Sequence, residues 1–326
     1  MLYIVNDNVD PYFNLALEEY LLKEFAQECF MLWRNSPCIV VGKNQNTLGE
    51  INLDYVRKHH IKVVRRLSGG GAVYHDLGNL NFTFIVNDLH DSFCDFSKFT
   101  APIIAVLRKL GVQAELSGRN DLCISGQKFS GNAQYKYRDR LLHHGTILFS
   151  AVIPDISAAL QVNPSKFEGK GVKSVAGRIT NIQSHLAAPI TIEELKTMIV
   201  NEVKTDRDHY EIYRLTSMDI ERVNESARGK YAAWDWNYGI SPEYNLQNKA
   251  RFQGGSVEVF LNVKTGVIRN ARIFGDFFGK SDVCQIEQAL LGVRHERKAI
   301  SDSLSRFCFE EYLAGVTMME FLDLLF

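Results

Sequence analysis

The chain has 326 residues, 46% of them hydrophobic and 23% charged, and its formal net charge is −1. This length and composition favour a two-domain globular enzyme. The near-neutral charge argues against a dedicated nucleic-acid binder, which carries a basic excess. No apolar run approaches the ~20 residues of a membrane helix, and the N-terminus lacks the pattern of a secretory signal. Six scattered cysteines without a C-x-x-C pair fit reduced thiols. We therefore expect a cytoplasmic protein.

Hydrophobic periodicity predicts alternating helices and short strands through the first 150 residues. In chain order the pattern indicates a helix over 14–24, strands over 38–41 and 80–86, a helix over 96–110, and strands over 112–116, 121–125, 129–134 and 146–150. Gly-containing turns separate the later strands. We therefore expect mostly antiparallel sheets flanked by helices, which is an α+β fold.

The regular pattern lapses over 163–181, a long, Gly-rich and basic loop of the kind that is usually functional or disordered. The segment 191–203 is predicted to be a helix that opens with a capping box, Thr191 to Glu194. Another helix is expected over 217–231.

The aromatic segment 234–242 breaks regular structure and is the candidate domain boundary. Beyond it, the pattern predicts a hairpin of strands 256–263 and 267–274, followed by three short helices. We therefore divide the chain into a catalytic domain, 1–240, and a small α+β accessory domain, 248–326.

The stretch Arg65-Arg66-Leu67-Ser68-Gly69-Gly70-Gly71 is the most informative part of the chain. A glycine triplet between β-formers is kept where the backbone must lie flat against a phosphate or an acyl chain. The guanidinium groups suit phosphate oxygens. A tight hairpin with surface arginines explains this segment equally well. The glycine spacing fits neither a P-loop nor a dinucleotide fingerprint.

Lys128 lies in a second Gly-flanked polar strand, beside Cys123 and Phe129, whose side chains are expected to be buried. A lysine in a partly apolar wall keeps its charge when an anion is nearby. Asp121 could supply that anion, or could hold a divalent metal together with substrate phosphates. The alternative is an exposed strand lysine.

Other catalytic classes fit less well. His143 and His144 are adjacent on a predicted strand and should point to opposite faces, so we expect no dedicated protein-only metal site. The chain lacks the G-x-S-x-G elbow of serine hydrolases. Cys123 is the one cysteine near the motifs, and its apolar strand suits an inert thiol.

Taken together, these motifs resemble the signature of lipoate-protein ligases. The resemblance is carried by Arg65 to Asp76, Gly78 to Asn81, Gly118 to Asp121, Lys128 to Ala133, His143 to Thr146, and Lys173 to Asn181. It covers most of the first 240 residues. The boundary segment and tail resemble the bacterial ligases that carry a C-terminal accessory domain.

The resemblance implies a catalytic domain of the biotin/lipoyl-ligase type that uses ATP, Mg²⁺ and lipoic acid. Such ligases form lipoyl-AMP, release pyrophosphate, and then transfer the lipoyl group to the lysine ε-amine of an acceptor. The acceptors are lipoyl domains of 2-oxoacid dehydrogenase E2 subunits or the glycine-cleavage H protein. A monomer that binds neither nucleic acid nor a membrane is expected.

On this basis we assign the catalytic role to Lys128, and Asp121 is a candidate for Mg²⁺ or phosphate. The residues expected to bind ATP and lipoyl-AMP are Arg66, Ser68, Gly69, Gly70, Gly71, Ala72, Val73, Tyr74, His75, Lys128, His144 and Lys173. The loop over 163–181 is expected to order over the bound adenylate.

Two rival functions remain. One is an octanoyl- or lipoyl-transferase of the same fold that works without ATP. The other is a lipoate-binding or lipoate-sensing protein without catalysis, against which the retained arginines, glycines and Lys128 argue.

Overall fold

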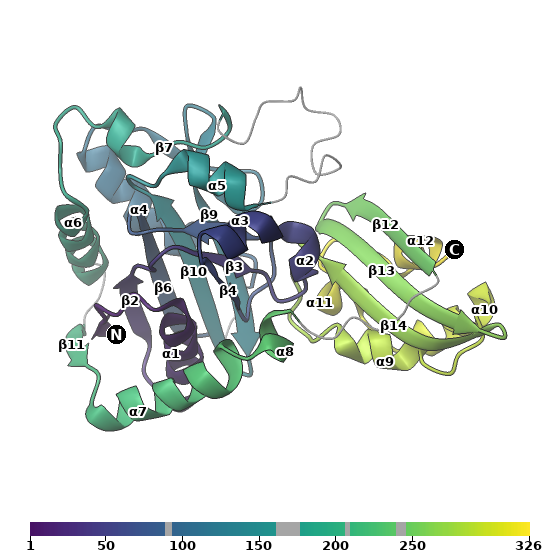
Figure 1. Ribbon diagram of the computed structural model, residues 1–326. Coiled ribbons are helices and arrows are strands. Elements are labelled where there is room, and N and C mark those ends of the chain that lie inside the picture. Colours follow the sequence, from purple (N-terminus) through teal and green to yellow (C-terminus); the bar gives the residue numbers. More distant parts are fainter. Residues whose placement is uncertain (89–92, 161–176, 206–208, 239–245) are drawn as a thin grey trace.

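The structure is a computed structural model that describes residues 1–88, 93–160, 177–205, 209–238 and 246–326. Figure 1 shows a larger N-terminal domain beside a smaller C-terminal one. None of the helices in these ranges is both long and apolar enough to cross a bilayer.

A large mixed sheet forms the centre of the N-terminal domain (Figure 1). Within the described residues it has eight strands, in the order β11 (Glu211–Arg214), β1 (Leu2–Val5), β2 (Cys29–Trp33), β6 (Asn79–Asn87), β10 (Arg140–Leu148), β9 (Gln127–Tyr137), β8 (Asp121–Ile124) and β7 (Ala114–Ser117). Each neighbouring pair in the part of this order that runs from β2 through β6, β10, β9 and β8 to β7 is antiparallel. Strand β1 is parallel to both of its neighbours, β2 and β11. The expected predominance of antiparallel pairing is confirmed.

Both faces of this sheet are covered, because its central strands are apolar on both sides. Alternate residues of β2 separate into two cores: Phe30 and Leu32 face one, and Met31 and Trp33 face the other. The first core includes α4 (Ser97–Lys109) and α6 (Ile192–Thr205). The second includes α1 (Pro11–Glu24), α7 (Ser217–Ser226) and the π-helical segment η4 (Ala227–Tyr231).

A small sheet packs against the second core and carries the arginine–glycine segment. It consists of β4 (Lys62–Arg65), β3 (Cys38–Val41) and β5 (Val73–His75), with β3 parallel to β4 and antiparallel to β5. Short helices lie near it: α2 (Thr47–Glu50), α3 (Leu53–Lys58), α5 (Ile153–Ala159) and α8 (Trp234–Asn237). The short helix η3 (Ile182–His185) instead contributes Ile182 to the first core. The glycine loop joins β4 to β5, so one end of this sheet positions it.

The C-terminal domain has its own sheet and its own apolar core. The sheet order is β12 (Leu246–Phe252), β13 (Gly255–Lys264) and β14 (Val267–Gly275), all antiparallel. The helices are α9 (Cys284–Leu290), α10 (Arg297–Leu304), α11 (Phe309–Tyr312) and α12 (Met318–Leu324). The predicted hairpin is therefore correct, but strand β12 was missed. The described part of this domain has four helices, so the prediction of three was wrong.

Several element predictions hold with shifted ends. The capping box at α6 is present, since Glu194 N–H donates to Thr191 Oγ1 at 3.2 Å and Thr191 N–H to the Glu194 carboxylate at 2.7 Å. The helix predicted over 217–231 changes to π geometry at Ala227. The last predicted strand of the domain instead begins at Arg140 and ends at Leu148. The segment 234–242 was expected to be irregular, yet its described part contains helix α8.

Candidate active site

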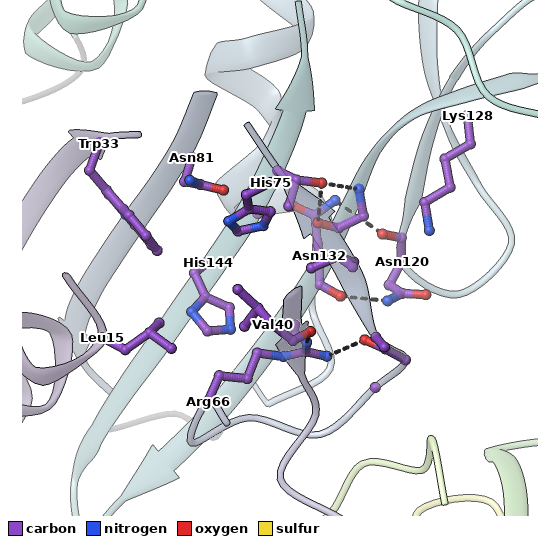
Figure 2. A pocket seen from close by; sticks show the side chains of 18 residues that line it. Leu15, Trp33, Val40, Arg66, His75, Asn81, Asn120, Lys128, Asn132 and His144 are labelled. Atoms are coloured by element: carbon purple, nitrogen blue, oxygen red, sulfur yellow. Dashed lines mark hydrogen bonds between the residues drawn. The ribbon is translucent and has the colours of Figure 1, made fainter. Parts of the chain in front are cut away.

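A cavity of about 120 Å³ lies between the arginine–glycine loop and strands β9 and β10. Figure 2 shows Leu15 and Trp33 at one end of it and Lys128 at the other. A larger cavity, of about 620 Å³, continues from the Lys128 end and shares Gly71 and Lys128 with the first. The two form one cleft that is apolar at its inner end and charged at its junction.

Arg66 is buried in this cleft and is not a surface arginine, so the alternative of a hairpin with exposed arginines is wrong. Its Nε–H donates to Ser68 Oγ at 3.0 Å, and Nη2 donates to the carbonyl oxygens of Gly69 and Gly71 at 2.7 and 2.9 Å. Burial lowers the pKa of the guanidinium to about 10, which still leaves it charged at neutral pH. Arg66 thus shapes the loop and also presents positive charge to the cavity.

Arg65 points elsewhere, which corrects the expectation that both guanidinium groups face a phosphate. Its guanidinium donates to the backbone oxygens of Gly42, Lys43, Gln45, Trp236 and Asn237 and to Thr47 Oγ1, over 2.6 to 3.0 Å. In return, Trp236 Nε1–H donates to the Arg65 carbonyl oxygen at 2.9 Å. Arg65 therefore fastens strand β4 to helix α8.

The three glycines have different surroundings. Gly70 has a φ of +92°, a conformation that side chains disfavour. At Gly71 a Cβ would meet nothing within 4 Å, so this position opens onto the cavity. At Gly69 a Cβ would lie 2.3 Å from the Phe277 carbonyl oxygen, because this glycine faces the C-terminal domain. The backbone expected to approach a ligand is thus centred on Gly70 and Gly71.

Lys128 is held at the junction of the two cavities by its backbone and by one carboxylate. Its N–H donates to the Arg178 carbonyl oxygen at 2.8 Å, and its own carbonyl oxygen accepts from Thr180 N–H at 2.9 Å. Nζ lies 2.7 Å from Asp121 Oδ1, and the two side chains remain 38% and 36% exposed. A Cβ on Gly131 would come within 2.9 Å of Nζ, so that glycine makes room for the ammonium group.

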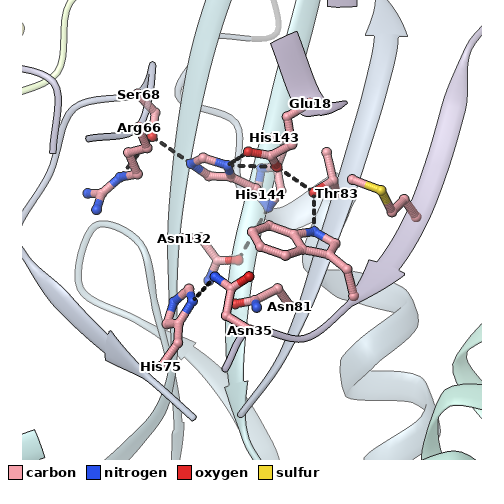
Figure 3. Close-up of polar contacts among 12 residues, drawn as sticks. Glu18, Asn35, Arg66, Ser68, His75, Asn81, Thr83, Asn132, His143 and His144 are labelled. Carbon is pink, nitrogen blue, oxygen red and sulfur yellow. Dashed lines mark hydrogen bonds and ion pairs between the residues drawn. The ribbon is translucent and has the colours of Figure 1, made fainter. Parts of the chain in front are cut away.

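A chain of hydrogen bonds runs from Arg66 to a buried carboxylate that the sequence analysis missed (Figure 3). His144 Nε2 lies 2.6 Å from Ser68 Oγ, and His144 Nδ1 lies 3.0 Å from both oxygens of Glu18. Because the carboxylate accepts, Nδ1 carries the proton and Nε2 accepts from the Ser68 hydroxyl. Ser68 is then free to accept from Arg66, so every link has one donor and one acceptor.

The same carboxylate continues the chain to the apolar end of the cavity. Thr83 Oγ1–H donates to Glu18 Oε1 at 2.6 Å, and Trp33 Nε1–H donates to Thr83 Oγ1 at 2.9 Å. Glu18 lies on α1 three residues from Leu15 and four from Leu22, which places it on the apolar face of that helix. A carboxylate at that spacing is the sequence signal that could have identified it.

His75 and Asn81 bring unpaired polar atoms to the cavity. His75 Nδ1 accepts from Asn35 Nδ2 at 3.1 Å, so the proton lies on Nε2. Among the described side chains, His75 Nε2 and Asn81 Nδ2 are buried without a hydrogen-bond partner, and both residues line the cavity. Burial lowers the pKa of His75 to about 3, which keeps the ring neutral. Two donors are thus left for a ligand.

His143 points to the opposite side of β10 from His144, as expected. It stacks on Phe99 with ring centroids 4.6 Å apart, and its Nε2 lies 3.2 Å from Asn132 Oδ1. The described residues hold no cluster of three or more His, Cys, Asp or Glu side chains suited to a metal ion. Cys123 is buried, and burial raises the pKa of its thiol.

The other predicted site residues are distributed around the cleft. Ala72 and Val73 line both cavities, and Tyr74 lines the larger one while packing in a neighbouring apolar core. Ser68 reaches the cavity through Arg66 and His144. Lys173, and the loop over 163–181 up to residue 176, lie outside the described residues.

Comparisons with known proteins agree with this architecture. Residues 10–204 match the lipoyl protein ligase A/B catalytic domain, and residues 241–325 match the bacterial lipoate protein ligase C-terminus. Lipoate-protein ligase LplJ of Bacillus subtilis is 46% identical over 331 residues, which covers 100% of both chains.

Two solved structures also resemble this chain in fold. The crystal structure of P. falciparum LipL1 in complex with lipoate has a TM-score of 0.81 and 27% identity, and the match covers 99% of this chain and 97% of that one. A bipartite lipoate protein ligase from Thermoplasma acidophilum, described with its E2 lipoyl domain, has a TM-score of 0.65 and 26% identity, covering 75% and 98% of the two chains. The chain belongs to the lipoate-protein ligase family, which confirms the resemblance found in its motifs.

Proposed function

We propose that this enzyme activates lipoic acid with ATP and Mg²⁺ and then transfers the lipoyl group to the ε-amine of an acceptor lysine. One observation carries the proposal: Arg66, which directly follows β4, and Lys128, on β9, line a single cavity together with Gly70 and Gly71. Such a cavity combines fixed positive charge with exposed backbone, which is what a bound acyl-adenylate requires.

In the first step, a lipoate carboxylate oxygen bonds to the α-phosphorus of ATP, and the bond from that phosphorus to the pyrophosphate oxygen breaks. Two anions must approach each other, so preorganised positive charge lowers the barrier. Lys128 belongs to both cavities and is placed to contact the phosphate at their junction. Arg66 supplies the second charge.

In the second step, the acceptor amine attacks the acyl carbon, the bond to the phosphate oxygen breaks, and AMP leaves. The amine loses a proton, and we assign no base for it. Lys128 can stabilise the charge that develops on the acyl and phosphate oxygens, because its ammonium group lies beside Gly131 at the cavity junction.

The inner end of the cavity suits the acyl chain. Leu15, Trp33 and Val40 supply an apolar lining for the dithiolane tail. The unpaired donors of His75 and Asn81 are available to the ligand's polar oxygens. Together these groups favour an acid with a long apolar tail.

Asp121 is the residue that would hold Mg²⁺, which proteins bind through one or two carboxylates together with substrate phosphates. It lines the larger cavity, and its Oδ1 lies 2.7 Å from Lys128 Nζ, beside the proposed phosphate position. The ion would neutralise phosphate charge.

The family membership supports a lipoyl domain as the acceptor, and the archaeal neighbour is described with an E2 lipoyl domain. We therefore propose E2 lipoyl domains, or the H protein, as partners of a cytoplasmic monomer. A transferase that works without ATP is the second candidate. The inert setting of Cys123 disfavours a cysteine acyl intermediate in it.

Incubation of the purified protein with lipoate, an acceptor lipoyl domain, and ATP with Mg²⁺ tests the proposal. Intact mass of the acceptor should show one lipoyl group, and omission of ATP should abolish it. Lipoylation that proceeds equally well without ATP would instead identify the transferase, and an acceptor that stays unmodified both with and without ATP would contradict both.

A further inference from the structure

The rim of the larger cavity gathers positive charge from both domains. Among the described residues that line it, Lys128, Arg119, Arg178 and Arg251 are cationic, and Asp121 and Asp276 are anionic. Arg251 lies on β12, and Asp276 directly follows β14, so both come from the C-terminal domain. In a chain whose net charge is −1, this local excess indicates an anionic ligand.

Arg119 is fixed in this rim by the C-terminal domain. Its guanidinium lies 4.3 Å from the centroid of the Phe278 ring, and its Nη2 donates to the Asp276 carbonyl oxygen at 3.3 Å. Its Nη1 donates to the Gly254 carbonyl oxygen. The neutral carbonyl groups and the ring hold the guanidinium in place, and the Asp276 carboxylate is the acidic group that acts on it most strongly.

Arg251 adds a second charge close to Arg119. Its Nη1 donates to Ser256 Oγ at 3.3 Å, a neutral hydroxyl on the neighbouring strand. Burial lowers the pKa of Arg119, the Asp276 carboxylate raises it, and Arg251 lowers it. The Arg119 guanidinium thus lies within range of both the Asp276 carboxylate and the Arg251 charge, and both arginines line the larger cavity.

The remaining lining fits the other parts of a nucleotide. Leu148, Ile156 and Ile179 form an apolar side suited to a base, and Lys128 marks the junction with the acyl cavity. With the α-phosphate at Lys128, the cationic rim is left for the rest of the triphosphate.

We propose that the C-terminal domain completes the nucleotide site: Arg251, together with Arg119, binds the β- and γ-phosphates of ATP and the pyrophosphate that leaves. The proposal rests on the proposed function, since it assigns the phosphate part of that site. It makes Arg251 a binding residue for the first step and gives it no part in the transfer step.

Arg251→Ala is the direct test, because the side chain is exposed and its loss leaves the core intact. The KM for ATP in lipoyl-AMP formation should rise about tenfold or more, the loss expected for charge-assisted hydrogen bonds. Inhibition by inorganic pyrophosphate should weaken in parallel, and transfer from preformed lipoyl-AMP should stay at the wild-type rate. Arg251→Lys should recover part of the ATP affinity.

Lys249→Ala is the matched control, since Lys249 is a cation on the same strand whose ammonium pairs with Glu258 at 3.4 Å. It should leave all three measurements unchanged. The inference would be overturned if the wild type and Arg251→Ala had the same KM for ATP and the same inhibition by pyrophosphate. It would also be overturned if Lys249→Ala raised the KM for ATP as much as Arg251→Ala does.

Calorimetric binding of inorganic pyrophosphate separates this inference from the proposed function. Weaker binding to Arg251→Ala than to the wild type supports the phosphate site even if no acceptor is modified. Equal binding by the two proteins contradicts the inference while leaving the ligase activity intact.

Discussion

Replacement of Lys128 by Ala gives the sharpest test of the proposed chemistry. The substitution removes one preorganised donor, for which a loss of about 10²–10³-fold in rate is expected. It also removes the ammonium group that lies 2.7 Å from Asp121 Oδ1. Mg²⁺ held at Asp121 would still offset that carboxylate, so the lost donor sets the expected size of the effect.

The assay is pyrophosphate release from ATP with lipoate and no acceptor. We expect Lys128→Ala to be at least about 10²–10³-fold slower than the wild type, whereas its unfolding free energy should change by about 1 kcal/mol or less. Lys109→Ala, which removes an exposed cation paired with Glu202, controls for the loss of surface charge. A rate for Lys128→Ala close to that of Lys109→Ala would refute the role given to Lys128.

Three further changes test other parts of the site. Arg65→Ala should lower the unfolding free energy in urea by about 3 kcal/mol or more, because several buried carbonyl groups lose a charged donor; an unchanged midpoint would contradict the anchoring role. Glu18→Gln should slow lipoyl-AMP formation roughly tenfold and shift the His144 tautomer, seen by ¹⁵N NMR; an unaltered ring spectrum would count against the hydrogen-bond chain. The depressed pKa of His75, about 3, means that the unfolded state binds a proton below pH ~6.5 and the native state does not. Stability should therefore fall from pH ~6.5 toward pH 4, by up to about 1.4 kcal/mol per pH unit for this group, and His75→Gln should show a flatter dependence; identical slopes would exclude this linkage.

Local patterns in the sequence predicted the parts of the fold that depend on near neighbours. The alternation around Lys128 located β8 and β9, and the Thr191 capping box marked the start of α6. The parallel pairing of β1 with β2 and β11 was missed, since Leu2 pairs with Cys29 on one side and with the distant Glu211 on the other, and neither pairing leaves a local mark.

The candidate site, too, could be predicted where it depends on local motifs and not where it depends on distant partners. Arg66, Gly70, Gly71, Lys128 and His144 could be found from motifs, and they do line one cavity. Whether an arginine faces a ligand or a carbonyl group is decided by distant partners. Arg65 is the example, because its acceptors come from 42–47 and from 236–237, and no property of the Arg65-Arg66 pair distinguishes the two side chains.

The clasp between Arg65 and helix α8 determines where the chain can be cut to isolate its N-terminal half. A fragment that stops before Trp236 loses two of the carbonyl acceptors of Arg65 as well as the indole that caps strand β4. A fragment that retains Asn237 keeps this clasp but uncovers Gly69 and Phe96, against which Phe277 and Phe278 now pack. Such a fragment should fold but aggregate through this exposed apolar patch, and replacement of Phe96 by a polar residue should reduce the aggregation.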